Sequence, residues 1–286
     1  MNLGILVSGN LGYIALKHLY INSKIEYVLT DSKSNSIIDF CNQNGIVHFI
    51  GNPRNGRGFN FCKRMKIDIL ISVNYLFLIE KDMIELPKKF AFNIHGSLLP
   101  KYRGRTPHVW AIINNESETG ITAHLIDEGC DTGDIIEQIK IKIDYEDTGS
   151  DILKKFNHHY LELLNLVLTK ASLGKLTFIK QRNEFASYFG KRASYDGKIN
   201  WDWQKERIYN WIRAQANPYP GAFTYFNGNK IIIDKIKFTE IGFTNEMSNG
   251  LVISTSPFLV KTPNGVVELC KVRKYDFELA NNIILK

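Results

Sequence analysis

Residues 90–100 read Phe90-Ala91-Phe92-Asn93-Ile94-His95-Gly96-Ser97-Leu98-Leu99-Pro100, an apolar run that enters a loop of Gly, Ser and Pro. This pattern predicts a short buried strand that ends at a turn. Because side chains alternate along a strand, Asn93 and His95 should leave one face while Ile94 leaves the other. Ligands bind beyond the carboxyl ends of strands in open α/β sheets. We therefore expect a ligand site around Asn93 and His95.

Strand-like and helix-like segments alternate on both sides of this stretch. The predicted strands are residues 2–7, 25–30, 46–50, 68–73, 90–95, 120–126 and 134–143. The predicted helices are residues 11–20, 37–43, 106–114 and 148–173. Such alternation predicts a parallel, Rossmann-like sheet with right-handed crossovers. The loop at residues 51–58 is basic and rich in glycine, which favours a surface loop.

The pattern changes after residue 188. A linker that contains Gly190 and Gly197 leads to a predicted helix at residues 204–216. Short strand-like runs with turn signals between them follow at residues 222–226, 230–238, 250–254, 258–261 and 266–272. They predict a small β-barrel or an open β-domain. The fold class is therefore α/β, with a Rossmann-like domain over residues 1–188 and a linker helix plus a small β-rich domain over residues 189–286.

Composition places the chain among globular proteins. Its 286 residues are 44% hydrophobic and 23% charged, with a formal net charge of +7. No apolar run is long enough for a membrane span, and the first residues lack the basic start of a signal peptide. The four cysteines lack paired spacing, so we expect a cytoplasmic protein with reduced thiols. The positive charge fits an anionic partner: nucleic acid, a nucleotide-linked substrate or polyglutamylated folate.

Three side chains suit the transfer of an acyl group to an amine. The Asn93 amide can donate a hydrogen bond to an oxyanion, and the His95 imidazole can move protons near neutral pH. A carboxylate beside the imidazole, with Asp131 as the candidate, would fix its tautomer and raise its basicity. Plain turn residues are the alternative. Residues 127–133 lack the later glutamate that a calcium-binding loop requires. The conceivable zinc ligands lack the paired spacing of zinc sites; they are His95, His108, His124 and Asp131.

Several sequence motifs resemble those of the folate-dependent formyltransferases, which include methionyl-tRNA and sugar-nucleotide enzymes. They are His95-Gly96-Ser97-Leu98-Leu99-Pro100-Lys101-Tyr102-Arg103-Gly104-Arg105, Glu118-Thr119-Gly120-Ile121-Thr122, and the glycine-aspartate pattern over residues 127–135. The resemblance implies that Asn93, His95 and Asp131 are catalytic. It also implies N10-formyltetrahydrofolate as the formyl donor and a C-terminal barrel. No metal is implied.

The resemblance is stronger to the sugar-nucleotide enzymes than to the tRNA enzymes. The polar turn at residues 30–36 passes directly into the next helix, without the long basic insertion of the tRNA enzymes. Residues 217–223 and 192–201 also resemble the sugar enzymes. The implied acceptor is the primary amine of a dTDP- or UDP-linked amino-deoxy sugar, in lipopolysaccharide or O-antigen biosynthesis. Methionyl-tRNA formyltransferase, formyltetrahydrofolate hydrolase and a non-catalytic nucleic-acid-binding protein remain alternatives.

Further site residues follow from the resemblance. Those implied for folate binding are Phe77, Leu78, Ile79, Ser97, Leu98, Leu99, Pro100, Arg105, Asp127, Glu128, Gly129 and Cys130. Those implied for the nucleotide sugar are Ser8, Gly9, Asn10, Lys101 and Tyr102. The alternative for the apolar residues is packing in the core. Lys101 and Arg105 could instead lie on the solvated surface, and residues 8–10 could form a plain turn. We expect packing in the core, in preference to stacking on a base, for Trp201, Trp211 and Tyr219. We expect no nucleic-acid partner and no membrane contact, with a homodimer as the default assembly.

Overall fold

The computed structural model describes residues 1–273, 278 and 280–286. The described chain forms two compact units. The first comprises Met1–Gly104, Gly120–Ile141 and Lys155–Tyr188, and the second comprises Arg105–Thr119, Lys142–Lys154 and Phe189–Lys286.

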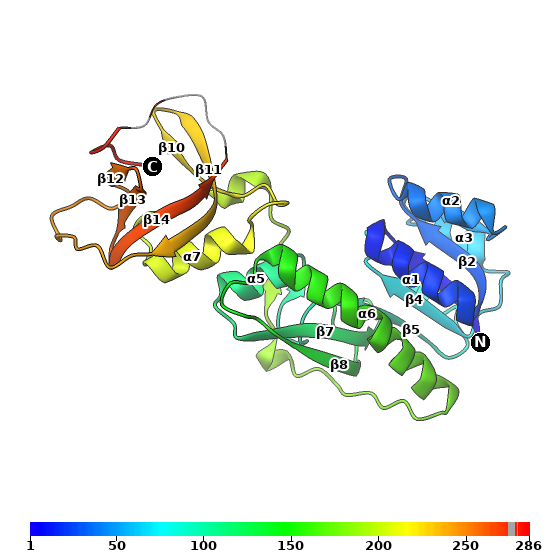
Figure 1. Ribbon diagram of the computed structural model, residues 1–286. Helices are drawn as coiled ribbons and strands as arrows, with labels where there is room; N and C mark the ends of the chain where they lie inside the picture. Colours follow the sequence, from blue (N-terminus) through cyan, green and yellow to red (C-terminus); the bar gives the residue numbers. More distant parts are fainter. Residues whose placement is uncertain (274–277, 279) are drawn as a thin grey trace. The chain divides into compact units, whose positions relative to one another are not determined.

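The first unit contains a seven-stranded sheet in the order β3-β2-β1-β4-β5-β7-β8 (Figure 1). Its strands are β1 (Asn2–Val7), β2 (Lys24–Thr30), β3 (His48–Ile50), β4 (Ile69–Val73), β5 (Phe90–His95), β7 (Glu118–Leu125) and β8 (Ile135–Lys142). The pairs from β3 to β5 are parallel, whereas β5 and β7 are antiparallel. The predicted Rossmann-like parallel sheet is confirmed, with an antiparallel extension that the sequence pattern did not indicate.

Helices cover this sheet. They are α1 (Gly9–Asn22), α2 (Asn35–Gln43), α3 (Arg57–Cys62), α4 (Lys81–Ile84) and α6 (Gly149–Ser172). Apolar residues of α6 recur at helical spacing, and Phe156, Leu163 and Val167 are almost fully buried. β1 and β4 are buried along nearly their whole length, as expected for central parallel strands. Residues 51–58 were predicted as a surface loop, but α3 begins within this segment, at Arg57.

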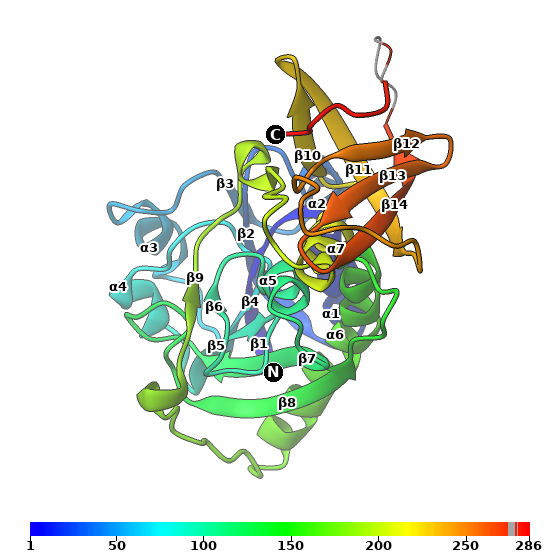
Figure 2. The ribbon, with the colours of Figure 1, turned by 90° about the vertical axis from the view of Figure 1, so that its left-hand side faces the viewer.

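The second unit contains a five-stranded antiparallel sheet in the order β10-β11-β14-β13-β12 (Figure 2). Its elements are α5 (Pro107–Ile113), the short helix η2 (Ser194–Gly197), α7 (Lys205–Ala214), β10 (Ala222–Phe226), β11 (Asn229–Phe238), β12 (Val252–Thr255), β13 (Phe258–Thr262) and β14 (Gly265–Val272). The sheet curls into a half-barrel, which confirms the prediction of a small β-rich domain. The Arg192 guanidinium lies 4.9 Å from the ring of Trp110 and 4.4 Å from the ring of Trp211, so it ties three segments of this unit together.

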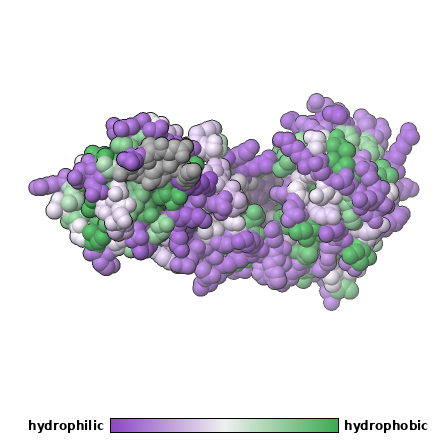
Figure 3. Space-filling model, turned by 45° about the horizontal axis from the view of Figure 1, so that its top comes forward, coloured by the Kyte–Doolittle hydropathy of each residue, from purple (hydrophilic) through white to green (hydrophobic). Residues whose placement is uncertain are grey.

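Short elements complete the chain. β6 (Arg103–Gly104) and β9 (Tyr188–Phe189) pair as a two-stranded sheet, and η1 (Asn183–Phe185) precedes β9. Among the helices that the structure describes, none is both long and apolar enough to cross a membrane. The face of the protein shown in Figure 3 is mainly hydrophilic, with small apolar patches.

Candidate active site

The end of β5 carries the two polar side chains that the sequence singled out. His95 is buried, with 7% of its surface exposed, and Asn93 is half-buried. Because β7 runs antiparallel to β5, it places His124 directly opposite Asn93 in the strand register. The chain thus brings an amide and two imidazoles to one edge of the sheet.

The backbone carbonyl of Tyr102 fixes the tautomer of His95. Nε2 of His95 lies 2.8 Å from this carbonyl oxygen, which can only accept, so Nε2 carries a proton. In the neutral ring Nδ1 is then the nitrogen with a lone pair. Nδ1 faces Oδ2 of Asp131 at 3.5 Å. The sequence interpretation gave Asp131 the task of fixing the tautomer. In the structure Tyr102 fixes it, and Asp131 faces Nδ1, the nitrogen with the lone pair.

Asp131 lies between the two imidazoles. Its Oδ2 accepts a hydrogen bond of 2.9 Å from the backbone N–H of Gly104, and its Oδ1 lies 3.5 Å from Nε2 of His124. Burial alone would raise the pKa of Asp131. His124, His95 and the Gly104 N–H more than offset this effect, so the net pKa lies well below its usual 3.8. Asp131 is therefore ionised at neutral pH.

The pKa of His95 reflects two opposing causes. Burial is the larger cause and lowers the pKa, whereas the negative charge of Asp131 raises it. The net pKa lies below the usual 6.5. His95 is therefore neutral at physiological pH, which is the state that a proton acceptor needs.

His124 orients the Asn93 amide, a contact that sequence reasoning missed. Nδ1 of His124 lies 2.8 Å from the Leu125 carbonyl and must donate to it, so Nε2 of the neutral ring accepts. The Asn93 NH₂ donates to this Nε2 at 3.2 Å, which leaves its second N–H for another acceptor. The sequence offered His124 only as a conceivable zinc ligand. Within the described residues, no group of three or more His, Cys, Asp or Glu side chains is arranged to hold a metal ion.

Two segments among the residues implied for folate binding, residues 77–79 and 127–130, lie in the first unit. Leu78 is 68% exposed, and Phe77 is half-buried with its ring 5.5 Å from that of Tyr75. Ile79 and Ile126 pack against the same apolar core, and Lys81 pairs with Glu128 at 3.0 Å. The ion pair with Lys81 therefore places the loop at residues 127–130 beside the segment that follows residues 77–79. Asp127, Glu128, Gly129 and Cys130 form an exposed loop.

The loop after β5 is held by side-chain hydrogen bonds. Ser97 is fully buried, and its hydroxyl donates to the Lys101 carbonyl at 2.7 Å. Thr122 donates to the Ser97 carbonyl at 2.6 Å and accepts from the Leu99 N–H at 3.2 Å. Gln138 donates to the Leu99 carbonyl at 3.0 Å. Leu98 and Pro100 are partly buried in this loop, which begins directly after His95 in the chain.

The other basic and aromatic residues of this loop differ in exposure. Lys101 and Arg105 are exposed, and Arg105 belongs to the second unit. Tyr102 is 8% exposed and adopts a left-handed backbone conformation with φ 59°, which turns its carbonyl to His95. The backbone of Tyr102 thus serves the site directly.

The first turn, residues 8–10, is largely occupied by internal contacts. The Gly9 N–H donates to the Ser34 hydroxyl at 2.9 Å, and Asn74 donates to the Ser8 carbonyl at 2.9 Å. Ser8 is 1% exposed, whereas Gly9 and Asn10 are exposed. Asn10 is therefore the residue of this turn whose side chain is best placed to meet a substrate.

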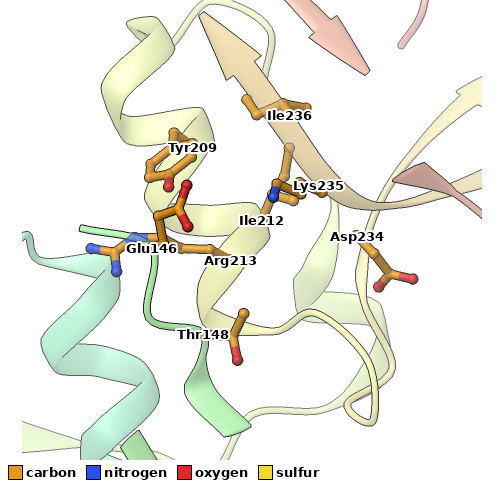
Figure 4. Close-up of a pocket in the computed structure, with 8 residues that line it drawn as sticks. All are labelled: Glu146, Thr148, Tyr209, Ile212, Arg213, Asp234, Lys235 and Ile236. Atoms are coloured by element: carbon orange, nitrogen blue, oxygen red, sulfur yellow. The ribbon is translucent and has the colours of Figure 1, made fainter. Parts of the chain in front are cut away.

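The aromatic residues of the second unit pack internally. Trp201 and Trp211 are buried, and their indole N–H groups donate to Thr224 and to the Gly197 carbonyl. The Tyr219 hydroxyl lies 2.8 Å from Nε2 of His108. A pocket of about 430 Å³ lies between α7 and β11 (Figure 4). Its lining residues are Glu146, Thr148, Tyr209, Ile212, Arg213, Asp234, Lys235 and Ile236.

Family models match both units of this chain. The model described as formyl transferase matches residues 59–168, and the model described as formyl transferase, C-terminal domain, matches residues 193–278. The chain belongs to the formyl transferase family. This finding confirms the resemblance on which the catalytic assignments of Asn93, His95 and Asp131 were based.

Individual relatives agree with this family. The bifunctional polymyxin resistance protein ArnA of Wigglesworthia glossinidia brevipalpis is 35% identical over 235 residues, which are 82% of this chain and 36% of that protein. This chain thus spans about a third of the length of that relative.

Two solved structures share the fold over nearly the whole chain. The N-formyltransferase from Helicobacter canadensis, in complex with folinic acid and dTDP-3-aminofucose, has a TM-score of 0.73 at 24% identity, covering 93% of this chain and 98% of that one. WlaRD, a sugar 3N-formyl transferase crystallised with dTDP and 5-N-formyl-THF, has a TM-score of 0.70 at 25% identity, covering 95% and 98%.

Proposed function

We propose that this formyl transferase family member moves the formyl group of N10-formyltetrahydrofolate to the primary amine of a dTDP- or UDP-linked amino-deoxy sugar. The observation that carries the proposal is the convergence of Asn93, His95 and Asp131 at the end of β5, with His95 neutral and Asp131 ionised. The proposal places the reaction in the cytoplasm, in the synthesis of a surface glycan.

We infer one task for each of the three side chains. The second N–H of the Asn93 amide donates to the oxygen of the formyl group, where negative charge develops when the amine attacks. Nδ1 of His95 accepts the proton that the amine loses as the new C–N bond forms, and Asp131 stabilises the resulting imidazolium. His95 then returns the proton to the donor nitrogen as the old C–N bond breaks.

The residues of the first unit fit a folate-type donor. The donor supplies a formyl carbon on a nitrogen that can leave as an amine. Leu78, with 68% of its surface exposed, and the neighbouring Phe77 offer apolar contact to a flat ring. The exposed loop at residues 127–130 contacts Lys81, three residues after Leu78, and offers backbone groups for hydrogen bonds. We infer that these two segments hold the pterin end of the donor.

The assignment of a sugar-nucleotide acceptor is supported by the sequence words and by the named relatives. WlaRD is a sugar 3N-formyl transferase by name and was crystallised with dTDP, and the Helicobacter canadensis N-formyltransferase was crystallised with a dTDP-linked amino sugar. The acceptor is also supported by the short connection between β2 and α2, residues 31–34, where the resemblance implies a long basic insertion in the tRNA enzymes. The lack of a nucleic-acid partner and the homodimer stay predictions.

The test is mass spectrometry of the purified protein with N10-formyltetrahydrofolate and a panel of dTDP- and UDP-linked 3-amino and 4-amino sugars. We expect one panel member to gain one formyl mass, and His95→Ala to abolish the gain. Formylation of charged initiator tRNA in place of every sugar would refute the acceptor and keep the chemistry. Consumption of the donor without any amine would instead indicate a hydrolase.

A further inference from the structure

A buried glutamine holds the backbone of the loop that carries Asp131. The segment after α6 returns to the start of β8, where Ile179 and Ile135 exchange two backbone hydrogen bonds of 2.8 Å. Two residues later, the Gln181 NH₂ donates to the carbonyl of Asp131 at 2.9 Å and to the carbonyl of Gly133 at 2.7 Å. Gln181 is 7% exposed, so water does not compete strongly for these bonds.

A buried arginine orients this glutamine. Arg103 is 1% exposed, and its Nε and Nη2 donate to Oε1 of Gln181 at 3.1 and 2.7 Å. Nη2 also donates to Asn183 at 3.1 Å, and Nη1 donates to the hydroxyl of Tyr188. These contacts fix the oxygen of the Gln181 amide on the side of Arg103, so its nitrogen must face the two carbonyls.

The residue that Gln181 holds has an unfavourable backbone conformation. Asp131 has φ 55°, in the left-handed region that costs a non-glycine residue about 1–2 kcal/mol. Gly104, the residue after Arg103, donates its N–H to the Asp131 carboxylate at 2.9 Å. The same pair of segments therefore holds Asp131 both at its backbone and at its side chain.

We propose that Arg103 and Gln181 are positioning residues that keep the Asp131 carboxylate beside Nδ1 of His95. They act through the Asp131 backbone and have no part in the chemistry itself. Without the two hydrogen bonds from Gln181, the loop relaxes from its strained conformation, and the 3.5 Å approach of Asp131 to His95 is lost. The test of this inference by kcat rests on the proposed function, whereas its test by titration of His95 does not.

The substitution Gln181→Glu isolates the donor role. A glutamate has the same shape and accepts from Arg103 more strongly, but it has no N–H for the carbonyls of Asp131 and Gly133. We expect kcat to fall about 10²-fold, the usual loss for a displacement of about 1 Å in an active site. In an Asp131→Asn background the same change should cost less than threefold, because the carboxylate it positions is already absent. Should Gln181→Glu fail to fold, Gln181→Met gives the same reading.

Gln215 supplies a matched control. It is also 7% exposed, accepts from Arg192 at 3.2 Å and donates to the Trp211 carbonyl at 2.9 Å, within the second unit. Gln215→Glu makes the same chemical change away from Asp131, and kcat should stay within threefold of the wild type. A loss in Gln215→Glu as large as in Gln181→Glu would overturn the inference, as would a loss that is fully multiplicative with Asp131→Asn.

An NMR titration of labelled histidines gives a readout that needs no substrate. Because the charge of Asp131 raises the pKa of His95, its displacement in Gln181→Met, which adds no charge of its own, should lower that pKa. An unchanged pKa would refute the positioning role. If the wild type formylates no sugar, the proposed function fails, but this titration still decides whether Gln181 positions Asp131.

Discussion

Replacing Asp131 with Asn tests the central electrostatic contact of the site. The change removes a negative charge and keeps the shape of the side chain. Because the Gly104 N–H at 2.9 Å requires an acceptor, the amide oxygen should take the place of Oδ2 and the NH₂ should face His124. The folded structure should therefore persist, and the loss should report on charge.

The magnitude follows from the distance. Two unit charges 3.5 Å apart attract by about 5 kcal/mol at an effective dielectric constant of about 20. If the proton is about half transferred to His95 in the transition state, roughly half of this energy is realised there. We therefore expect kcat to fall by about 70-fold, since 1.36 kcal/mol corresponds to a factor of ten.

The assay is single-turnover formyl transfer, with the acceptor that the panel identifies, across a range of pH. The rate should fall on the acid side as His95 becomes protonated, because only the neutral ring accepts a proton. Asp131 raises the pKa of His95, so its removal should move this acid limb to lower pH. A rate within threefold of the wild type, or an acid limb that moves to higher pH, would refute the proposed role.

Three further substitutions test other parts of the structure. Asn93→Ala removes the oxyanion donor and should lower kcat by about 10²- to 10³-fold in the same assay; near-normal turnover would contradict that role. Burial lowers the pKa of His108 to about 4, so the unfolded state binds a proton between pH 6.5 and 4 that the folded state does not, and stability falls as the pH falls through this range. In urea unfolding at pH 7 and pH 4.5, His108→Gln should make the pH-dependent loss of stability smaller by about 2–3 kcal/mol, and an unchanged loss would argue against burial of the neutral ring. Gly133→Ala should lower the thermal midpoint clearly, because a Cβ there would lie 2.0 Å from the Leu125 carbonyl oxygen; a midpoint equal to that of the wild type would show that the loop can shift.

Local sequence patterns predicted the elements that carry the site. The strand expected at residues 90–95 is β5 (Phe90–His95), and the helix expected at residues 148–173 is α6 (Gly149–Ser172). Alternation of side chains correctly placed Asn93 and His95 at one edge of the sheet. These predictions succeeded because periodicity and turn residues are local properties of the chain.

The contacts that align the site were not predictable in the same way. The antiparallel pairing of β5 with β7, which sets His124 opposite Asn93, depends on strands that are about thirty residues apart. Arg103 and Gln181 are separated by 78 residues, and arginine and glutamine are usually exposed. From the sequence alone, residues of these types are expected at the solvated surface. Only the buried position of Arg103 shows that its hydrogen bonds are part of the interior.

The balance that sets the pKa of His95 explains why this alignment matters. Burial lowers the pKa and would leave the imidazole a weak base, while the charge of Asp131 raises the pKa toward neutrality. The burial of His95 follows from its position at the end of β5 and is fixed by the fold. The charge of Asp131 acts only when its loop brings the carboxylate to Nδ1, and it weakens with distance. Residues that hold the loop, Gln181 above all, therefore tune the basicity of His95 without touching it, and a titration of His95 in their variants measures that control directly.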